Sequence, residues 1–145
     1  MTRDPATIDR LRRQIADLHL EDRISLVGEL DEASLDAEYD RADLFVLATL
    51  QETYGMAAAE ALARGLPVIG TRTGAIPALV GDEAGALVTP GDVRGLSRAL
   101  SLALDDAGVR ARWAAAARRV RDRLPTWADA CSRMSAALEG ILAHG

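Results

Sequence analysis

The sequence predicts an α/β fold in which a parallel sheet is covered by helices on both faces, a three-layer arrangement. Short apolar runs rich in Val, Ile and Leu alternate along the chain with segments of helical periodicity, and the connections between them are short. Strands that consist of continuous apolar runs are typical of parallel sheets buried on both sides. A chain of 145 residues is long enough to build one such domain around a proper core.

The first part of the chain predicts two helices and two strands in alternation. Residues 5–20 carry apolar side chains at the spacing of one helix face, and Pro5 stands where proline is favoured, at the helix start. The apolar run 24–28 (ISLVG) predicts a strand. Residues 31–42 begin with an aspartate suited to capping a helix, and the run 43–49 (DLFVLAT) predicts a buried strand.

The remaining chain continues this alternation. A helix is expected to begin within residues 54–57 and to end at Gly65, because a glycine followed by Pro67 is typical of helix C-termini. The later elements are strands at residues 67–71 and 85–90 and helices at residues 92–104, 108–124 and 126–144.

Composition limits the classes of function. The net charge of −5 argues against general nucleic-acid binding, which needs a basic surface. No apolar run approaches the roughly 18 residues of a membrane span, and the first residues lack the apolar segment of a signal peptide, so we expect a soluble, cytoplasmic protein. The arginine-rich helix at 110–123 is less densely basic than membrane-surface helices usually are, so membrane association is possible but unsupported. Cys131 is the only cysteine, which excludes an internal disulfide and a thiolate metal cluster.

Two glutamates in the stretch QETYGMAAAEALARG are the candidate functional residues. Glu52 follows the predicted strand 43–49, at the edge where parallel sheets bind ligands. Gly55 allows a close turn into the next helix, whose first N–H groups and dipole favour a phosphate. Glu60 is about five residues further, roughly 7 Å along the helix axis. The ribose hydroxyls of a nucleotide whose phosphates rest on the helix start could reach its carboxylate.

Spacing alone leaves other interpretations open. Glu21 and Glu29 have the same separation with nothing functional around them, and a solvated helix face would explain Glu60. One alternative is a non-catalytic nucleotide-binding or interaction module. Another is a glycoside hydrolase with two carboxylates roughly 5 to 10 Å apart, although the helix after Gly55 favours phosphate instead.

The string ETYGMAAAEALARGLPVIGTRTGAIPALV, followed by GALVTPGD, resembles a known family. It is similar to the C-terminal donor-binding domain of the family-4 (group 1) retaining glycosyltransferases, which have the GT-B fold. The resemblance spans about residues 8–127 and includes the Glu–x7–Glu pair, the helix end ARGLPV and the Thr-Gly-x-x-Pro loop. It implies a Rossmann-like sheet and an enzyme that transfers a sugar from a nucleotide-sugar to an acceptor with retention.

The resemblance also implies a role for each candidate residue. Glu52 would be catalytic, binding hydroxyls of the donor sugar and supporting the developing oxocarbenium charge. Glu60 would hold the ribose hydroxyls. Backbone contacts to sugar hydroxyls, diphosphate and base would come from Thr53, Tyr54, Gly55, Met56 and Gly28. One position departs from the family, because Ala78 stands where a glutamate is usual. We therefore expect no ligand contact from residue 78.

The resemblance implies no cofactor and no metal, since the helix dipole and basic side chains would neutralise the leaving diphosphate. In the family, an acceptor domain and two strands of the donor domain precede the part that this chain matches. Residues 1–124 are therefore expected to form a truncated donor domain, with a sheet gap between the strands 24–28 and 43–49, and residues 125–145 a C-terminal helix. Alone, the chain is expected to be inactive and to need the acceptor domain, a partner chain or self-association at its exposed sheet edge.

Overall fold

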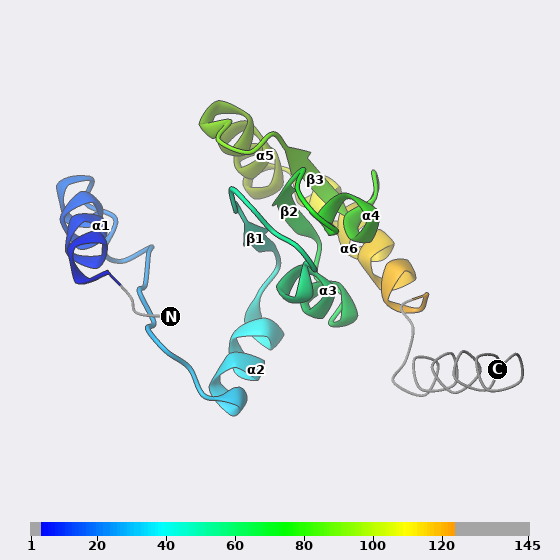
Figure 1. Ribbon diagram of the computed structural model, residues 1–145, viewed down its shortest axis with the longest axis horizontal. Coiled ribbons are helices and arrows are strands. Elements are labelled where there is room, and N and C mark those ends of the chain that lie inside the picture. Colours follow the sequence, from blue (N-terminus) through cyan, green and yellow to red (C-terminus); the bar gives the residue numbers. More distant parts are fainter. Residues whose placement is uncertain (1–3, 124–145) are drawn as a thin grey trace, which may run out of the picture. The chain divides into compact units, whose positions relative to one another are not determined.

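The computed structural model describes residues 4–123 of the chain, which divides into two compact units, residues 1–35 and residues 36–145. The described part of the first unit contains helix α1 (Pro5–Asp17), labelled in Figure 1. Asp4 caps this helix, since its Oδ1 accepts a hydrogen bond from the backbone N–H of Ala6 at 3.1 Å. The start at Pro5 is confirmed, but the helix ends at Asp17 and not at residue 20.

The predicted strand at residues 24–28 is wrong. These residues have no regular secondary structure, and Ile24, Leu26 and Val27 are exposed. A strand exists only where a neighbouring strand accepts and donates its backbone hydrogen bonds. Among the described residues no strand pairs with this segment, so its β-branched composition alone does not make it a strand.

The second unit is built on a three-stranded parallel sheet. Its strands β1 (Phe45–Leu47), β2 (Val68–Thr71) and β3 (Gly85–Val88) lie side by side in the order β1-β2-β3 (Figure 1). All three were predicted, though β1 and β3 are shorter than their apolar runs. The sequence predicted a gap in the sheet between a strand at residues 24–28 and the strand that is now β1. Because residues 24–28 form no strand, β1 is an edge strand of the described sheet.

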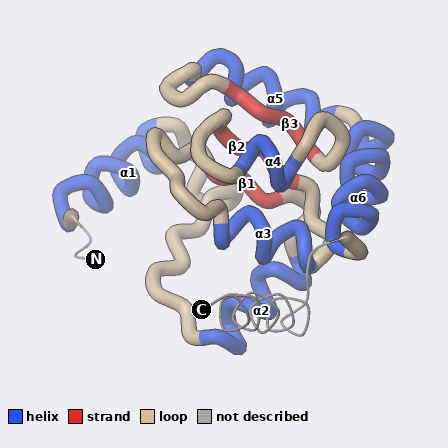
Figure 2. Tube along the Cα trace, turned by 45° about the vertical axis from the view of Figure 1, so that its right-hand side comes forward, coloured by secondary structure: helices blue, strands red, loops and turns tan. Residues whose placement is uncertain are grey.

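Helices cover both faces of this sheet, which confirms the three-layer α/β fold. Helices α3 (Met56–Ala63) and α4 (Ile76–Val80) lie on one face, and α5 (Val93–Asp105) covers the other (Figure 2). The alternation along β2 shows the division, because Val68 belongs to the core on the α3 side and Ile69 to the core on the α5 side. Helix α6 (Ala107–Arg121) packs against both α3 and α5.

Most helix boundaries follow the predicted capping signals. Asp31 accepts a hydrogen bond from the N–H of Ser34 at the start of α2 (Glu32–Arg41), and Asp92 does the same for Gly95 at the start of α5, each at 2.8 Å. The short helix α4 was not predicted, since its residues form part of what the sequence suggested was a loop. No helix within residues 4–123 is both long enough and apolar enough to cross a membrane.

The predicted helix at residues 126–144, with Cys131, lies outside the described residues. The predicted domain boundary after residue 124 falls where the description ends, so it stays a prediction.

Candidate functional site

Glu52 lies in the loop between β1 and α3, at the carboxyl edge of the sheet. Its side chain turns back onto its own loop, where Oε1 accepts hydrogen bonds from the N–H groups of Thr53 at 3.0 Å and Gly55 at 3.1 Å. Within residues 4–123, no protein hydrogen bond reaches its second oxygen, Oε2. The carboxylate is half-buried and fixed at one oxygen, while the other remains available to a ligand.

The loop that follows β2 braces this glutamate. The hydroxyl of Thr73 accepts a hydrogen bond from the Glu52 N–H at 3.4 Å. Gly74 lies so close that a Cβ added to it would stand 1.9 Å from the Glu52 carbonyl oxygen. Just beneath, the buried Thr71 donates its hydroxyl proton to the carbonyl of Thr49 at 2.6 Å. The loops after β1 and β2 are therefore joined at the sheet edge by direct backbone packing.

Gly55 makes the turn from this loop into α3, as predicted. It is buried with φ +67°, a conformation that glycine adopts without strain, and an added Cβ would lie 2.9 Å from Cδ1 of Leu79. Helix α3 starts at Met56 and directs its first turn toward the same edge as Glu52. The side chains of Tyr54 and Met56 are largely exposed beside it.

Glu60 projects from the middle of α3 with 46% of its side chain exposed. Its Oε1 lies 3.8 Å from Nη2 of Arg64, one helical turn further along. The same Arg64 nitrogen is 2.5 Å from Oδ1 of Asp36 on α2, and the guanidinium carbon lies 4.7 Å from the ring centre of Tyr39. We call these four residues, Asp36, Tyr39, Glu60 and Arg64, the Glu60 cluster.

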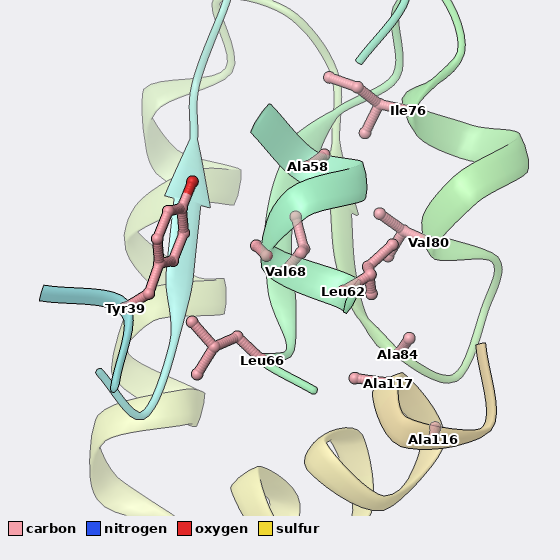
Figure 3. Close-up of a cluster of buried hydrophobic side chains, with 11 residues drawn as sticks. Tyr39, Ala58, Leu62, Leu66, Val68, Ile76, Val80, Ala84, Ala116 and Ala117 are labelled. Atoms are coloured by element: carbon pink, nitrogen blue, oxygen red, sulfur yellow. The ribbon is translucent and has the colours of Figure 1, made fainter. Parts of the chain in front are cut away.

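Tyr39 forms the buried base of this cluster. It is 8% exposed, lies beside β1 (Figure 3) and stacks on Phe45 with 6.0 Å between ring centres. Burial raises the pKa of the Tyr39 hydroxyl, and the neighbouring Glu60 carboxylate raises it further, while Arg64 acts in the opposite direction.

The structure brings most of the predicted residues together. Glu52, Thr53, Tyr54, Gly55 and Met56 share the loop at the start of α3, with Glu60 further along the same helix. Gly28 belongs to the other compact unit, where it has φ +78°, and its contact with a base stays a prediction.

Sequence reasoning missed the residues that hold the two glutamates. For Arg64 a signal existed, because it stands four residues after Glu60, the spacing of helical ion pairs. Thr73 and Gly74 were part of a recognised motif, without a role. Asp36 and Tyr39 come from another helix, and nothing local in the sequence indicates that they meet Glu60.

Two further predictions concern metals and the departure at residue 78. Among residues 4–123, no three His, Cys, Asp or Glu side chains gather into a possible metal site. Independence of metal nevertheless stays a prediction about the reaction. Ala78 is an exposed residue of α4.

A parallel α/β domain with a carboxylate loop and a helix start at its carboxyl edge has the architecture of a small-molecule-binding domain. Comparison with known families is more specific. The profile of the family described as "Glycosyl transferases group 1" matches residues 5–120, and the chain belongs to this family.

Similar curated proteins carry different acceptors in their names. The chain is 31% identical over 140 residues to a D-inositol 3-phosphate glycosyltransferase of Corynebacterium glutamicum, covering 96% of this chain and 33% of that protein. It is 38% identical over 94 residues to a glycogen synthase of Mycobacterium tuberculosis, covering 64% of this chain and 23% of the other. The chain therefore spans about a third or less of these relatives.

Solved structures confirm the fold. A sucrose-phosphate synthase from Thermosynechococcus elongatus matches with a TM-score of 0.82 and 27% identity, covering 98% of this chain and 37% of that one. The C-terminal domain of a group 1 glycosyltransferase from Francisella tularensis matches with a TM-score of 0.73 and 27% identity, covering 84% and 62%. The Rossmann-like sheet described above is thus part of a GT-B fold.

Proposed function

We propose that this chain binds a nucleotide-sugar donor and forms part of a glycosyltransferase that transfers the sugar with retention of anomeric configuration. Membership of the group 1 glycosyltransferases supports the reaction class. The observation that carries the proposal is the position of Glu52, which stands at the carboxyl edge of the sheet with one oxygen fixed by backbone N–H groups. A fixed carboxylate at a ligand-binding edge is suited to a defined contact with a bound sugar.

Glu52 acts at the donor sugar in this proposal. As the bond between sugar and diphosphate breaks, positive charge develops at the anomeric carbon and ring oxygen, and a nearby carboxylate stabilises it. The carboxylate is held by the N–H groups of Thr53 and Gly55, so it needs little reorganisation during the reaction. The Oε2 atom of Glu52 is the oxygen that accepts a hydrogen bond from a sugar hydroxyl.

The start of α3 receives the diphosphate. The first turn of a helix presents N–H groups without intrahelical partners, and its dipole favours an anion. Glu52 already occupies the N–H groups of Thr53 and Gly55. The backbone N–H groups of Tyr54 and Met56 are therefore the proposed phosphate contacts in this loop. Further along the helix, the Glu60 carboxylate accepts hydrogen bonds from the ribose hydroxyls.

Transfer needs more than donor binding. The chain spans 33% of the length of the D-inositol 3-phosphate glycosyltransferase that it resembles, and the names of its relatives differ in their acceptors. We therefore expect the 145-residue chain to bind nucleotide without transferring sugar by itself, and we carry no acceptor over from the relatives. Donor binding in the cytoplasm without a metal is part of the same proposal.

Calorimetric titration of the chain with UDP, GDP and ADP tests the proposal. We expect one of them to bind, and Glu60→Gln to weaken this binding by about tenfold or more, because a hydrogen bond to a charged group is lost. Glu21→Gln is the matched control, since Glu21 belongs to the other pair with the same spacing and should bind as the original chain does. Absence of binding by all three nucleotides, or equal binding by Glu60→Gln, would contradict the proposal.

A further inference from the structure

We propose that Arg64, fixed by Asp36 and by the Tyr39 ring, is a positioning residue that holds the Glu60 carboxylate ready to accept ribose hydroxyls. This inference rests on the proposed function and assigns a part of its specificity to the Glu60 cluster. Arg64 itself does not contact the nucleotide in this account. It acts through Glu60.

Arg64 is better fixed than an ordinary surface arginine. Only 30% of its side chain is exposed, and it is the C-cap residue of α3, where chain direction changes. Asp36 binds its Nη2 at 2.5 Å, and the face of the Tyr39 ring lies under the guanidinium at 4.7 Å. Both contacts come from α2, so one helix fixes a side chain of another. For comparison, the Arg119 side chain, paired with Glu83 at 3.1 Å, is 60% exposed.

The fixed guanidinium limits where Glu60 can point. A glutamate on an exposed helix face normally samples several rotamers, and ordering it on binding costs conformational entropy. Here Arg64 attracts one carboxylate oxygen from the C-terminal side, and the Tyr39 ring supports the same guanidinium from below. A carboxylate that is already ordered binds its ligand more tightly, because less entropy is lost on binding.

The ion pair is loose enough to leave room for a ligand. At 3.8 Å the separation of Nη2 and Oε1 exceeds the 2.7–2.9 Å usual for a charged hydrogen bond. Arg64 makes its short contact with Asp36 instead. The lone pairs of Glu60 are therefore not consumed by the guanidinium, and nearly half of its side chain faces solvent. Two adjacent hydroxyls, as on a ribose, suit such a carboxylate.

A purely structural role is the competing explanation, since exposed ion pairs between helices contribute little and affect every ligand alike. Comparing UDP with its 2′,3′-dideoxy analogue separates the two roles, because the analogue keeps the base and phosphates but lacks the hydroxyls that Glu60 would bind. If UDP is not the preferred nucleotide, the ribose and dideoxyribose forms of the preferred one replace this pair. The ratio of the two Kd values then reports ribose recognition alone.

We expect the original chain to favour UDP over the dideoxy form, and Glu60→Gln to remove most of this preference. Arg64→Met keeps an apolar stem over Tyr39 but lacks the charge, and should reduce the preference by about threefold to tenfold through UDP affinity alone. Arg64→Lys should retain an intermediate preference, because it keeps the positive charge but loses the planar guanidinium that lies over the Tyr39 ring. Asp36→Asn tests the same network without altering α3, and Arg119→Met is the matched control for loss of an ion-paired arginine.

The outcomes distinguish this inference from the proposed function. If Glu60→Gln lowers the preference but Arg64→Met and Asp36→Asn do not, the positioning role is wrong and the proposed function stands. Equal weakening of both nucleotides by Arg64→Met would likewise show a structural role only. If no nucleotide binds, or the original chain does not distinguish the ribose form, the proposed function fails and the inference fails with it.

Discussion

Glu52 lies in the loop before helix α3 and Glu60 lies within that helix, yet the protein holds the two carboxylates by different means. Around Glu52 the constraints come from the backbone. The Glu52 carboxylate accepts hydrogen bonds from N–H groups of its own loop, and Gly74 packs against the backbone carbonyl of Glu52. Around Glu60 they come from side chains on two helices. Backbone packing cannot adjust to an added atom, whereas a side-chain network can lose one member at a time. Substitutions near Glu52 should therefore affect folding, and those near Glu60 should affect binding.

The largest effect is expected from Gly74→Ala. The residue has φ +53°, and its new Cβ would overlap the carbonyl oxygen and carbon of Glu52 at 1.9 and 2.6 Å. Left-handed strain and steric overlap together should lower the free energy of unfolding by about 2 to 5 kcal/mol. Urea denaturation followed by circular dichroism measures this change.

Gly91→Ala is the matched control for Gly74→Ala. Gly91 also has positive φ, +80°, but nothing lies within 4 Å of its added Cβ. It should show the backbone strain alone, about 1 kcal/mol. Equal losses in the two variants would mean that the loops after β1 and β2 are not packed together as described.

Thr71→Val is expected to have the next largest effect. The buried hydroxyl donates to the carbonyl of Thr49 at 2.6 Å, and valine has the same shape without a donor. Loss of this bond, with a carbonyl left unsatisfied, should lower the free energy of unfolding by about 1 to 2 kcal/mol. Thr71→Ser retains the hydroxyl and should preserve the bond. Thermal melting that ranks serine below valine would contradict this account of the loop.

Glu52 itself should contribute less to stability than the residues that brace it. Glu52→Ala removes the acceptor for the N–H groups of Thr53 and Gly55 and should cost about 1 kcal/mol, as loss of a helix cap does. Glu52→Gln keeps an oxygen in that place and should cost less. If glutamine destabilises as much as alanine in urea denaturation, the negative charge near the helix start matters more than the hydrogen bonds.

Much of the fold could be predicted from periodicity, and the exceptions have a physical cause. The runs at β2 and at residues 24–28 are similar in composition, but only the first is a strand. Strands β1 and β3 pair with β2 on either side, and helices on the two faces of the sheet bury Val68 and Ile69 fully. Pairing is a non-local property that a short apolar run does not reveal.

The site was predictable where its signals are local. Glu52 and Gly55 belong to one short motif, and the turn that the motif suggested is present. The residues that hold Glu60 were not predictable as a group, because Asp36 and Tyr39 meet α3 only through tertiary packing. Roles at a bound sugar or ribose came from family resemblance, and binding measurements must test them.

The smallest effect is expected on the pKa of Tyr39, because its titration changes one proton and removes no side chain. In a Tyr54→Phe background, Tyr39 is the remaining tyrosine, and ultraviolet absorbance follows its ionisation. Burial first and Glu60 second raise the Tyr39 pKa above its ordinary value of about 10. The folded chain thus holds this proton more tightly than the unfolded chain does. Its contribution to stability is full below about pH 10 and is lost as pH rises through the folded-state pKa.

Substitution of the neighbours should move this pKa in opposite directions. Glu60→Gln removes a negative charge and should lower the Tyr39 pKa, whereas Arg64→Met removes a positive charge and should raise it further. Glu83→Gln, on the far side of an ion pair with Arg119, should leave it unchanged. A Tyr39 pKa that responds to neither neighbour would mean that Glu60 points away from the cluster. The α2 residues Asp36 and Tyr39 would then not position Glu60 for ribose binding through Arg64.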